Sequence, residues 1–173
     1  MWQISEITPR IYLGDIEGAA NRDLLKRKGI THIVNLSYND NFYPADFKYL
    51  KIDIEDEDNV NIYQYFAPTK AFIDKALSDK KSKVFVHCMA GISRSVTIVV
   101  AYLMNEMTYR EALAYVRSKR SIANPNPGFI RQLQIYEETF TSGKGNAPSG
   151  NVSTRNQRFL RSKVTENFSS WRL

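Results

Sequence analysis

Short apolar segments alternate along the chain with longer segments of helical periodicity. The short segments are rich in β-branched and aromatic residues and end at glycine or in polar runs, which is typical of strands. They are Ile11–Leu13, His32–Leu36, Phe47–Ile54 and Val84–His87. The longer segments predict helices over Ala19–Lys28, Asn61–Leu77, Ser95–Glu106, Thr108–Arg120 and Pro127–Phe140. This order predicts an α/β fold with a central mixed, mostly parallel sheet flanked by helices.

Three of the predicted helices carry capping signals. Thr108 and Glu111 form a capping box, in which the two side chains satisfy main-chain N–H groups of the first turn. Asn126 directly precedes Pro127, so we expect asparagine as the N-cap and proline as the first helical residue. Asn61 with the glutamine three positions later resembles a capping pair at the start of its helix.

Charge divides the chain into three parts. Residues 1–141 hold 18 Lys and Arg against 17 Asp and Glu, whereas residues 142–173 hold six basic residues and one acid. We expect one domain over 1–141, a flexible Gly, Asn and Ser-rich linker over 142–153, and a basic tail over 154–173. The near-neutral domain excludes a dedicated nucleic-acid partner, because binding a phosphate backbone needs a concentrated cationic face.

The tail has an amphipathic interpretation. If residues 154–173 were helical, four apolar side chains would form one stripe, largely opposite the arginines: Leu160, Val164, Phe168 and Trp171. Such a segment suits an anionic membrane or an acidic groove of a partner. Its several Ser and Thr residues are mediocre helix formers, so a tail with incidental arginines is the competing interpretation.

The chain contains one cysteine, Cys88, which excludes an intramolecular disulfide and gives no indication of an oxidising compartment. The first residues lack a positively charged segment followed by an apolar one, and the most apolar run, Val96–Met104, is too short to span a bilayer. We therefore expect a soluble protein of the cytoplasm, with the nucleus as a further location.

The segment His87–Ser95, with the sequence HCMAGISRS, lies between a predicted central strand and a predicted helix. In such a loop the main-chain N–H groups point into one concavity that can hold a phosphate dianion. The phosphate-binding residues would be Met89, Ala90, Gly91, Ile92, Ser93 and Arg94. Gly91 lets the backbone curl without a Cβ, and the Arg94 guanidinium can bind two phosphoryl oxygens at once.

Cys88 lies beneath the expected phosphate, in a field that favours the nucleophilic thiolate. Attack would give a phosphocysteine, and the departing oxygen would need a proton from an acid that later activates water. Ser95 can hydrogen-bond the leaving sulfur, with helix capping as its alternative role. His87 precedes the cysteine on the strand and points to the opposite face, so we expect it to fix the loop.

On these residues the chain resembles the cysteine-dependent protein phosphatases, and among them the small dual-specificity phosphatases that lack a targeting domain. The resemblance runs from Ile4 to Phe140 and includes IYLG at 11–14, the His87–Ser95 segment, and NPNPGF at 124–129 followed by QL. The last segment is closest to atypical members in stress-kinase signalling. The resemblance implies hydrolysis of phosphotyrosine and phosphoserine/threonine in a protein substrate, with a stress or MAP kinase as candidate, and no cofactor.

The general acid is sought among the crowded carboxylates that follow the strand Phe47–Ile54. Crowding of like charges favours protonation of some of them. In the family the acid follows an Ile-x-Ile-x segment, which corresponds here to residues 52–55 and selects Asp56, with Asp58 as the alternative.

Asn126 either caps its helix alone or, as the resemblance implies, also braces the phosphate loop. The two histidines and the cysteine lie far apart without ligand spacing, so no metal is expected.

Two other functions stay open at this point. One is a phosphoinositide or RNA 5′-phosphatase of the same superfamily. Lipid-directed members often place lysine in the loop, whereas positions 89–93 are all uncharged here. The other is a phosphopeptide-binding module without turnover. Such proteins typically lose the nucleophile or the acid, but Cys88, Arg94 and Asp56 are all present.

Overall fold

The computed structural model describes residues 3–142, and within this range five strands form one sheet in the order β1-β2-β5-β3-β4. The strands are β1 (Ile4–Thr8), β2 (Ile11–Gly14), β3 (His32–Asn35), β4 (Lys48–Lys51) and β5 (Val84–His87). Strand β1 pairs antiparallel with β2, and the other three pairs are parallel. The predicted mixed, mostly parallel sheet is confirmed, with β5 at its centre.

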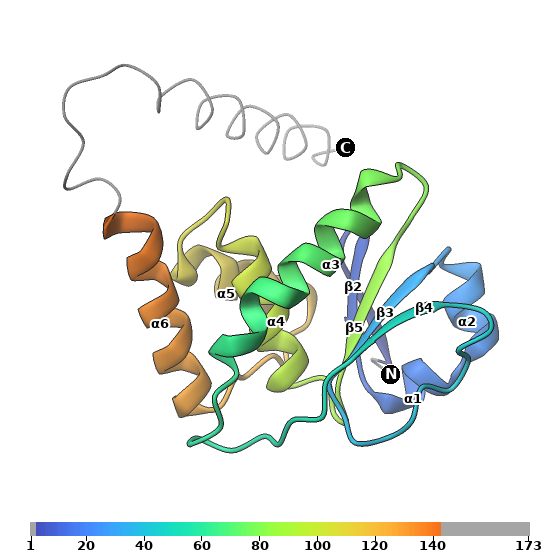
Figure 1. Cartoon of the computed structure of the whole chain (residues 1–173), viewed down its shortest axis with the longest axis horizontal. Helices are drawn as coiled ribbons and strands as arrows, with labels where there is room; N and C mark the ends of the chain where they lie inside the picture. The colour runs from blue at the N-terminus through green and yellow to red at the C-terminus, as the bar shows by residue number, and fades with distance from the viewer. Residues whose placement is uncertain (1–2, 143–173) are drawn as a thin grey trace.

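Helices cover both faces of this sheet (Figure 1). They are α1 (Ile16–Ala20), α2 (Arg22–Arg27), α3 (Phe66–Ser78), α4 (Arg94–Leu103), α5 (Tyr109–Lys119) and α6 (Pro127–Thr141). Successive strand residues feed two separate apolar clusters, because side chains alternate between the faces. Ile33 and Phe85 join the cluster under α1 and α2, whereas Val34 and Val86 join the cluster under α3 to α6.

Near the N-terminus, strand β1 was not predicted and one predicted helix needs correction. The apolar pattern does not predict β1, because its buried face carries Ser5 beside Ile7 while Ile4 lies on the more exposed face. The helix predicted over Ala19–Lys28 is in fact two short helices, α1 and α2. Asn21 ends α1 and caps α2, and its Oδ1 accepts a hydrogen bond from the Leu24 N–H at 3.1 Å.

The strand predicted over Phe47–Ile54 is regular only over β4, although Ile52 and Ile54 remain buried beyond it. The helix predicted from Asn61 begins only at Phe66, after a 3-10 turn at Tyr63–Tyr65 whose N-cap is Ile62. Asn61 Oδ1 accepts from the Gln64 N–H at 3.3 Å within this turn. The capping box at Thr108 and the N-cap at Asn126 are confirmed. No helix within residues 3–142 is long and apolar enough to cross a bilayer. The predicted linker, beyond residue 142, and the tail lie outside the described residues.

The direction of the chain around β5 determines where a ligand can bind. Strands β2 and β5 are parallel neighbours, but β2 leads to α1 on one face of the sheet and β5 leads to α4 on the other. Loops that separate in this way leave a crevice at the carboxyl ends of the strands, which is where α/β sheets bind ligands. The predicted phosphate loop, residues 88–94, lies at this point, where the chain leaves neighbouring strands toward opposite faces of the sheet.

Candidate active site

Cys88 lies where β5 ends, and it is buried, with 2% of its surface exposed. Its Sγ lies 3.1 Å from the Oγ of Ser95. Ser95 is the second residue of α4, whose N-cap is Ser93. The alternative role of Ser95 as a helix cap therefore does not account for its position, and its hydroxyl contacts the sulfur.

The loop from Cys88 to α4 offers its main-chain N–H groups to a ligand. Within residues 3–142, no acceptor takes a hydrogen bond from the N–H groups of positions 89–94. Two of the loop carbonyls bond to neighbouring segments: Met89 O accepts from the Ile16 N–H at 2.9 Å, and Ile92 O from the Asn124 N–H at 2.8 Å. Gly91 has a φ of 64°. Successive N–H groups in such a curl form a nest that suits an oxyanion.

Arg120, which sequence reasoning missed, lies fully buried behind this loop. Its Nε donates to Gly91 O at 2.7 Å, its Nη2 to Ala90 O at 3.3 Å, and its Nη1 to Ser5 Oγ at 3.1 Å. Because C=O and N–H of one planar peptide point in opposite directions, holding these carbonyls turns the following N–H groups away from Arg120. A basic residue at the end of a helix is ordinarily exposed, so no pattern predicted this role.

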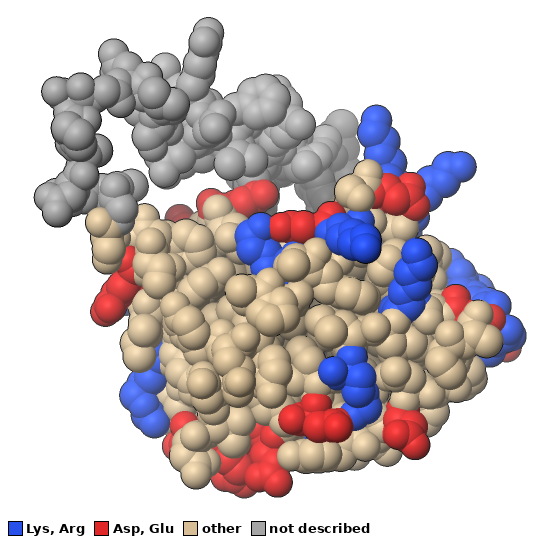
Figure 2. Space-filling view, viewed as in Figure 1, with Lys and Arg blue, Asp and Glu red and all other residues tan. Residues whose placement is uncertain are grey.

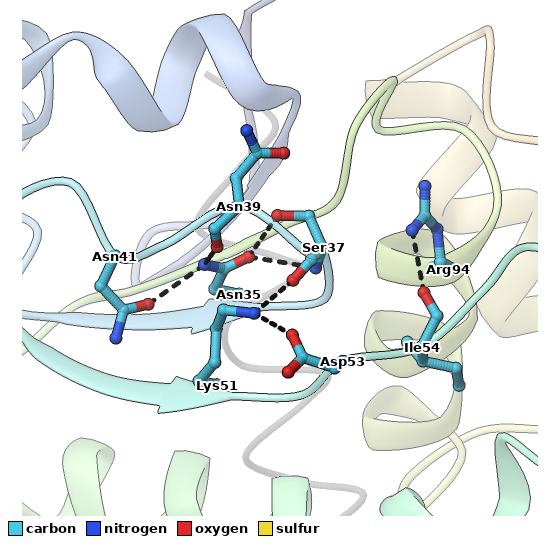
Figure 3. A network of polar contacts seen from close by, with 8 residues as sticks. All are labelled: Asn35, Ser37, Asn39, Asn41, Lys51, Asp53, Ile54 and Arg94. Carbon is cyan, nitrogen blue, oxygen red and sulfur yellow. Dashed lines mark hydrogen bonds and ion pairs between the residues drawn. The ribbon is translucent and has the colours of Figure 1, made fainter.

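The Arg94 side chain connects α4 to the segment that follows β4 (Figure 3). Its Nη1 donates to Ile54 O at 2.9 Å. Its Nε is buried and has no hydrogen-bond partner among the described residues. A buried donor without an acceptor is costly, and a phosphoryl oxygen would supply that acceptor.

Asp56 is connected to the phosphate loop through Asn126. The Nδ2 of Asn126 donates to Asp56 Oδ1 at 2.8 Å, and its main-chain N–H donates to Ser93 Oγ at 2.9 Å. Asp58 lies against α6 through its main chain. A Cβ added to Gly128 of that helix would lie only 1.9 Å from Asp58 O. Of the two candidate acids, Asp56 is therefore the one whose carboxylate is tied to the loop. Asn126 caps α6 and braces the loop at the same time.

His87 is buried, and its Nδ1 lies 3.1 Å from Cys88 O. The ring stacks on Phe85, with 5.5 Å between ring centroids and 18° between planes. Burial is the main cause that lowers the pKa of His87 to about 4, so the imidazole is neutral at pH 7. These contacts place His87 against the start of the loop.

A second network organises the segment after β3 (Figure 3). Asn35 is buried, and its Oδ1 accepts from the Ser37 hydroxyl at 2.7 Å. Lys51 donates to Ser37 O at 2.6 Å and pairs with Asp53. Asn35 is in register with His87 on β5. The network thus joins the segment after β3 to Asp53, the first residue of the acidic segment at 53–58.

Acidic side chains gather along the lower edge of the face in Figure 2, where Figure 1 places the segment between β4 and α3. This edge is acidic and not basic, so only local groups, namely Arg94 and the loop N–H groups, would attract a phosphate there. Among residues 3–142, no group of three or more His, Cys, Asp or Glu side chains could hold a metal ion.

These features define an α/β protein in which a loop of N–H groups without acceptors in residues 3–142 follows a buried cysteine at the end of the central strand. Comparison with known proteins identifies the family to which the chain belongs. The model of the family described as "Dual specificity phosphatase, catalytic domain" matches residues 11–139. The chain belongs to this family, that is, to the dual-specificity group of the cysteine-dependent phosphatases, in agreement with the resemblance of its motifs.

Individual relatives of the chain are also named as protein phosphatases. The chain is 43% identical over 143 residues to "Protein phosphatase Slingshot homolog" of Xenopus laevis, covering 81% of this chain and 20% of that protein. It is 44% identical over 138 residues to "Dual specificity protein phosphatase 1" of Arabidopsis thaliana, covering 78% and 69%. It spans 20%, 28% and 22% of the length of three curated relatives that it matches.

A solved structure shares the fold. The crystal structure of human tyrosine phosphatase-like serine/threonine/tyrosine-interacting protein aligns with a TM-score of 0.76 at 40% identity. The alignment covers 80% of this chain and 97% of that chain.

Proposed function

We propose that this chain hydrolyses phosphotyrosine and phosphoserine/threonine in proteins through a phosphocysteine intermediate. The observation that carries the proposal is the position of buried Cys88 at a loop whose N–H groups, like the Nε of Arg94, have no acceptor within residues 3–142. Donors fixed around a phosphoryl group stabilise its oxygens most where negative charge develops in the transition state. The family membership supports the same chemistry.

In the first step the Cys88 thiolate attacks phosphorus. The S–P bond forms as the P–O bond to the substrate breaks, and Asp56 gives its proton to the departing oxygen. Arg94 and the loop N–H groups hold the three non-bridging oxygens during this transfer. The position of Asp56, tied to the loop through Asn126, supports its assignment as the acid.

In the second step water attacks the phosphocysteine. Asp56, now a carboxylate, accepts a proton from the water as the new P–O bond forms and the S–P bond breaks. Inorganic phosphate and the Cys88 thiolate are the products. The Ser95 hydroxyl, 3.1 Å from the sulfur, can donate a hydrogen bond to the thiolate as its charge returns.

The proposed substrate class is a phosphorylated protein, with a stress or MAP kinase as candidate from the motif at 124–129. A phosphoinositide or RNA 5′-phosphatase has less support, because loop positions 89–93 carry no cation for additional phosphates. The cytoplasmic or nuclear location, and binding of the tail to an anionic membrane or acidic partner, stay predictions.

Hydrolysis of para-nitrophenyl phosphate and of phosphotyrosine and phosphothreonine peptides tests the proposal, with Cys88→Ser as the variant. We expect turnover by the wild type and loss of at least about 1,000-fold in the variant, since serine is a far weaker nucleophile in this field. Acid quenching of the wild type with ³²P-labelled substrate should trap label on the protein. Equal rates for the two proteins would overturn the assignment.

A phosphopeptide-binding module is the second candidate, because the human relative at 40% identity is named as phosphatase-like and as an interacting protein. Calorimetric titration of wild type and Cys88→Ser with the same phosphopeptides separates the two functions. Binding by both proteins, with turnover by neither, would favour the module. Binding by the variant with turnover by the wild type alone favours the enzyme.

A further inference from the structure

Asn126 connects three parts of the site through hydrogen bonds of its main-chain N–H and its side-chain amide. Its main-chain N–H donates to Ser93 Oγ in the phosphate loop at 2.9 Å. Its Oδ1 accepts from the Phe129 N–H at 2.9 Å, which caps α6. Its Nδ2 donates to Asp56 Oδ1 at 2.8 Å. One residue therefore joins the loop, through its main chain, to a helix and the proposed acid, through its side chain.

The cap determines which end of the amide meets Asp56. A main-chain N–H can only donate, so the amide oxygen must face Phe129 and the NH₂ group must face the carboxyl. Capping alone does not require asparagine, because serine and aspartate are comparable N-caps. The contact with Asp56 does require it, because serine is too short to donate across this distance and aspartate has no donor when ionised.

The bond to Asn126 also distinguishes the two carboxyl oxygens. Oδ1 accepts from an amide that can only donate, so in the acid form of Asp56 the proton sits on Oδ2. Asp56 is otherwise exposed and lies in an irregular segment, where its side chain would sample several rotamers. Asn126 removes that freedom, and its N–H bond to Ser93 sets the position relative to the loop that holds phosphate.

We propose that Asn126 is the positioning residue for proton transfer, holding Asp56 by Oδ1 so that Oδ2 carries and receives the proton. This inference rests on the proposed function, because it concerns how that acid works. Asn126 does not touch the reacting atoms. It acts through Asp56, and its removal should affect only the part of the rate that depends on protonation of the leaving group.

The test compares Asn126→Ser with the wild type on aryl phosphates whose leaving groups differ in basicity. Serine keeps the helix cap and the main-chain bond to Ser93 but loses the donor to Asp56. We expect kcat to fall about 10 to 100-fold for basic leaving groups, a part of the 10²–10⁴ that general acid catalysis contributes, and less than about 3-fold for acidic ones. Inhibition by inorganic phosphate should be unchanged. An equal fall for every substrate would overturn the proposal.

Asn21→Ser is the matched control. Asn21 caps α2 through a bond from the Leu24 N–H, the same local role, without a contact to the acidic segment. It should lose a similar small amount of stability with no change in the leaving-group dependence. The same kinetic change in this control would assign the effect to loss of the asparagine cap.

A double-mutant cycle completes the test. In an Asp56→Asn background, Asn126→Ser should cost less than about 2-fold further, since the two residues act as one unit. Losses that multiply would show that Asn126 acts elsewhere and would overturn the proposal. Absence of turnover in the wild type would instead count against the proposed function, so the two failures are distinguishable.

Discussion

The phosphate loop and the acidic segment lie beside each other, yet they are held in different ways. The loop N–H groups and Arg94 belong to one run of consecutive residues between a central strand and a helix, although Ile16, Arg120 and Asn124 hold the loop carbonyls. Asp56 is exposed in an irregular segment, and this segment is bonded to Arg94 at Ile54 and to Asn126 at Asp56, across 40 and 70 residues of sequence. The groups proposed to bind an oxyanion are thus neighbours in sequence, whereas the placement of the proposed proton donor depends on long-range contacts.

The sharpest test of this contrast replaces each of the two candidate acids in turn. Asp56→Asn should lower kcat for substrates with basic leaving groups by about 10²–10⁴, because the departing oxygen loses its proton source. Asp58→Asn, two positions away in the same segment, should change it by less than about 3-fold. Steady-state kinetics on an aryl phosphate series measures both. A larger loss from Asp58→Asn would assign proton transfer to the other carboxyl.

We expect the phosphate loop to lose its shape when a side chain is added at Gly91. A Cβ on Gly91 would lie 2.5 Å from the Nη2 of Arg120 and 2.6 Å from Gly14 O. Gly91→Ala should therefore displace the loop, lowering kcat/KM about 100-fold or more and weakening inhibition by inorganic phosphate, as removal of oxyanion donors does.

Gly29→Ala is the control for the strain of a positive φ alone. Gly29 has a φ of 77°, and a Cβ there would meet only the Lys83 side chain, at 3.6 Å or more. It should cost about 1–2 kcal/mol in the free energy of unfolding, measured in urea, and leave kinetics unchanged. Similar activity loss in both alanine variants would contradict a specific role for space behind the loop.

Arg120→Met tests whether the loop is as local as its sequence indicates. The change leaves Ala90 O and Gly91 O without their buried donor. It should destabilise the protein by about 2–3 kcal/mol and weaken phosphate inhibition. Urea unfolding and product inhibition report the two effects. Arg110→Met, at an exposed position of α5, should cost under about 1 kcal/mol with inhibition unchanged. If it matches Arg120→Met, the buried contacts are unimportant.

The smallest expected effect concerns His87 and pH. Its folded pKa of about 4 lies below the ordinary value of 6.5, so on acidification the unfolded chain binds the proton first. This contribution to stability is complete above pH 6.5 and is lost as the pH falls toward 4, by at most about 1.4 kcal/mol per pH unit. Urea unfolding at pH 7, 6 and 5 should show a shallower decline for His87→Asn than for the wild type.

His32→Asn provides the comparison for the pH series, because the pKa of His32 is also lowered by burial but the ring is only half-buried. We expect a smaller change of slope than for His87→Asn. Parallel slopes for the wild type and His87→Asn would show that His87 does not contribute to the acid sensitivity of the fold.

The elements around the phosphate loop could be predicted because their signals are short-range. An apolar strand at Val84–His87, a glycine in the loop and helical periodicity after it are visible within about twenty residues. Strand β1 escaped prediction because Ser5 sits on its buried face. The break at Asn21 was hidden because its side chain caps one helix while its backbone ends another.

The choice of acid shows where prediction from residues ends. Asp56 and Asp58 have the same side chain in the same crowded turn, and only the resemblance of the Ile-x-Ile segment favoured the first. Asn126 likewise had two compatible interpretations. The contact between Asn126 and Asp56 joins residues 70 positions apart, and no local pattern encodes such a distance.

The sequence by itself determined the α/β class, the phosphate loop and the identity of its cysteine and arginine, since strand, loop and helix signals act between near neighbours. Tertiary structure alone decided which carboxylate is bonded to Asn126 beside the loop, that Arg120 lies buried behind the loop, and that Asn126 contacts the cap, the loop and Asp56 together. Packing of distant segments creates these contacts, and packing depends on the whole folded chain.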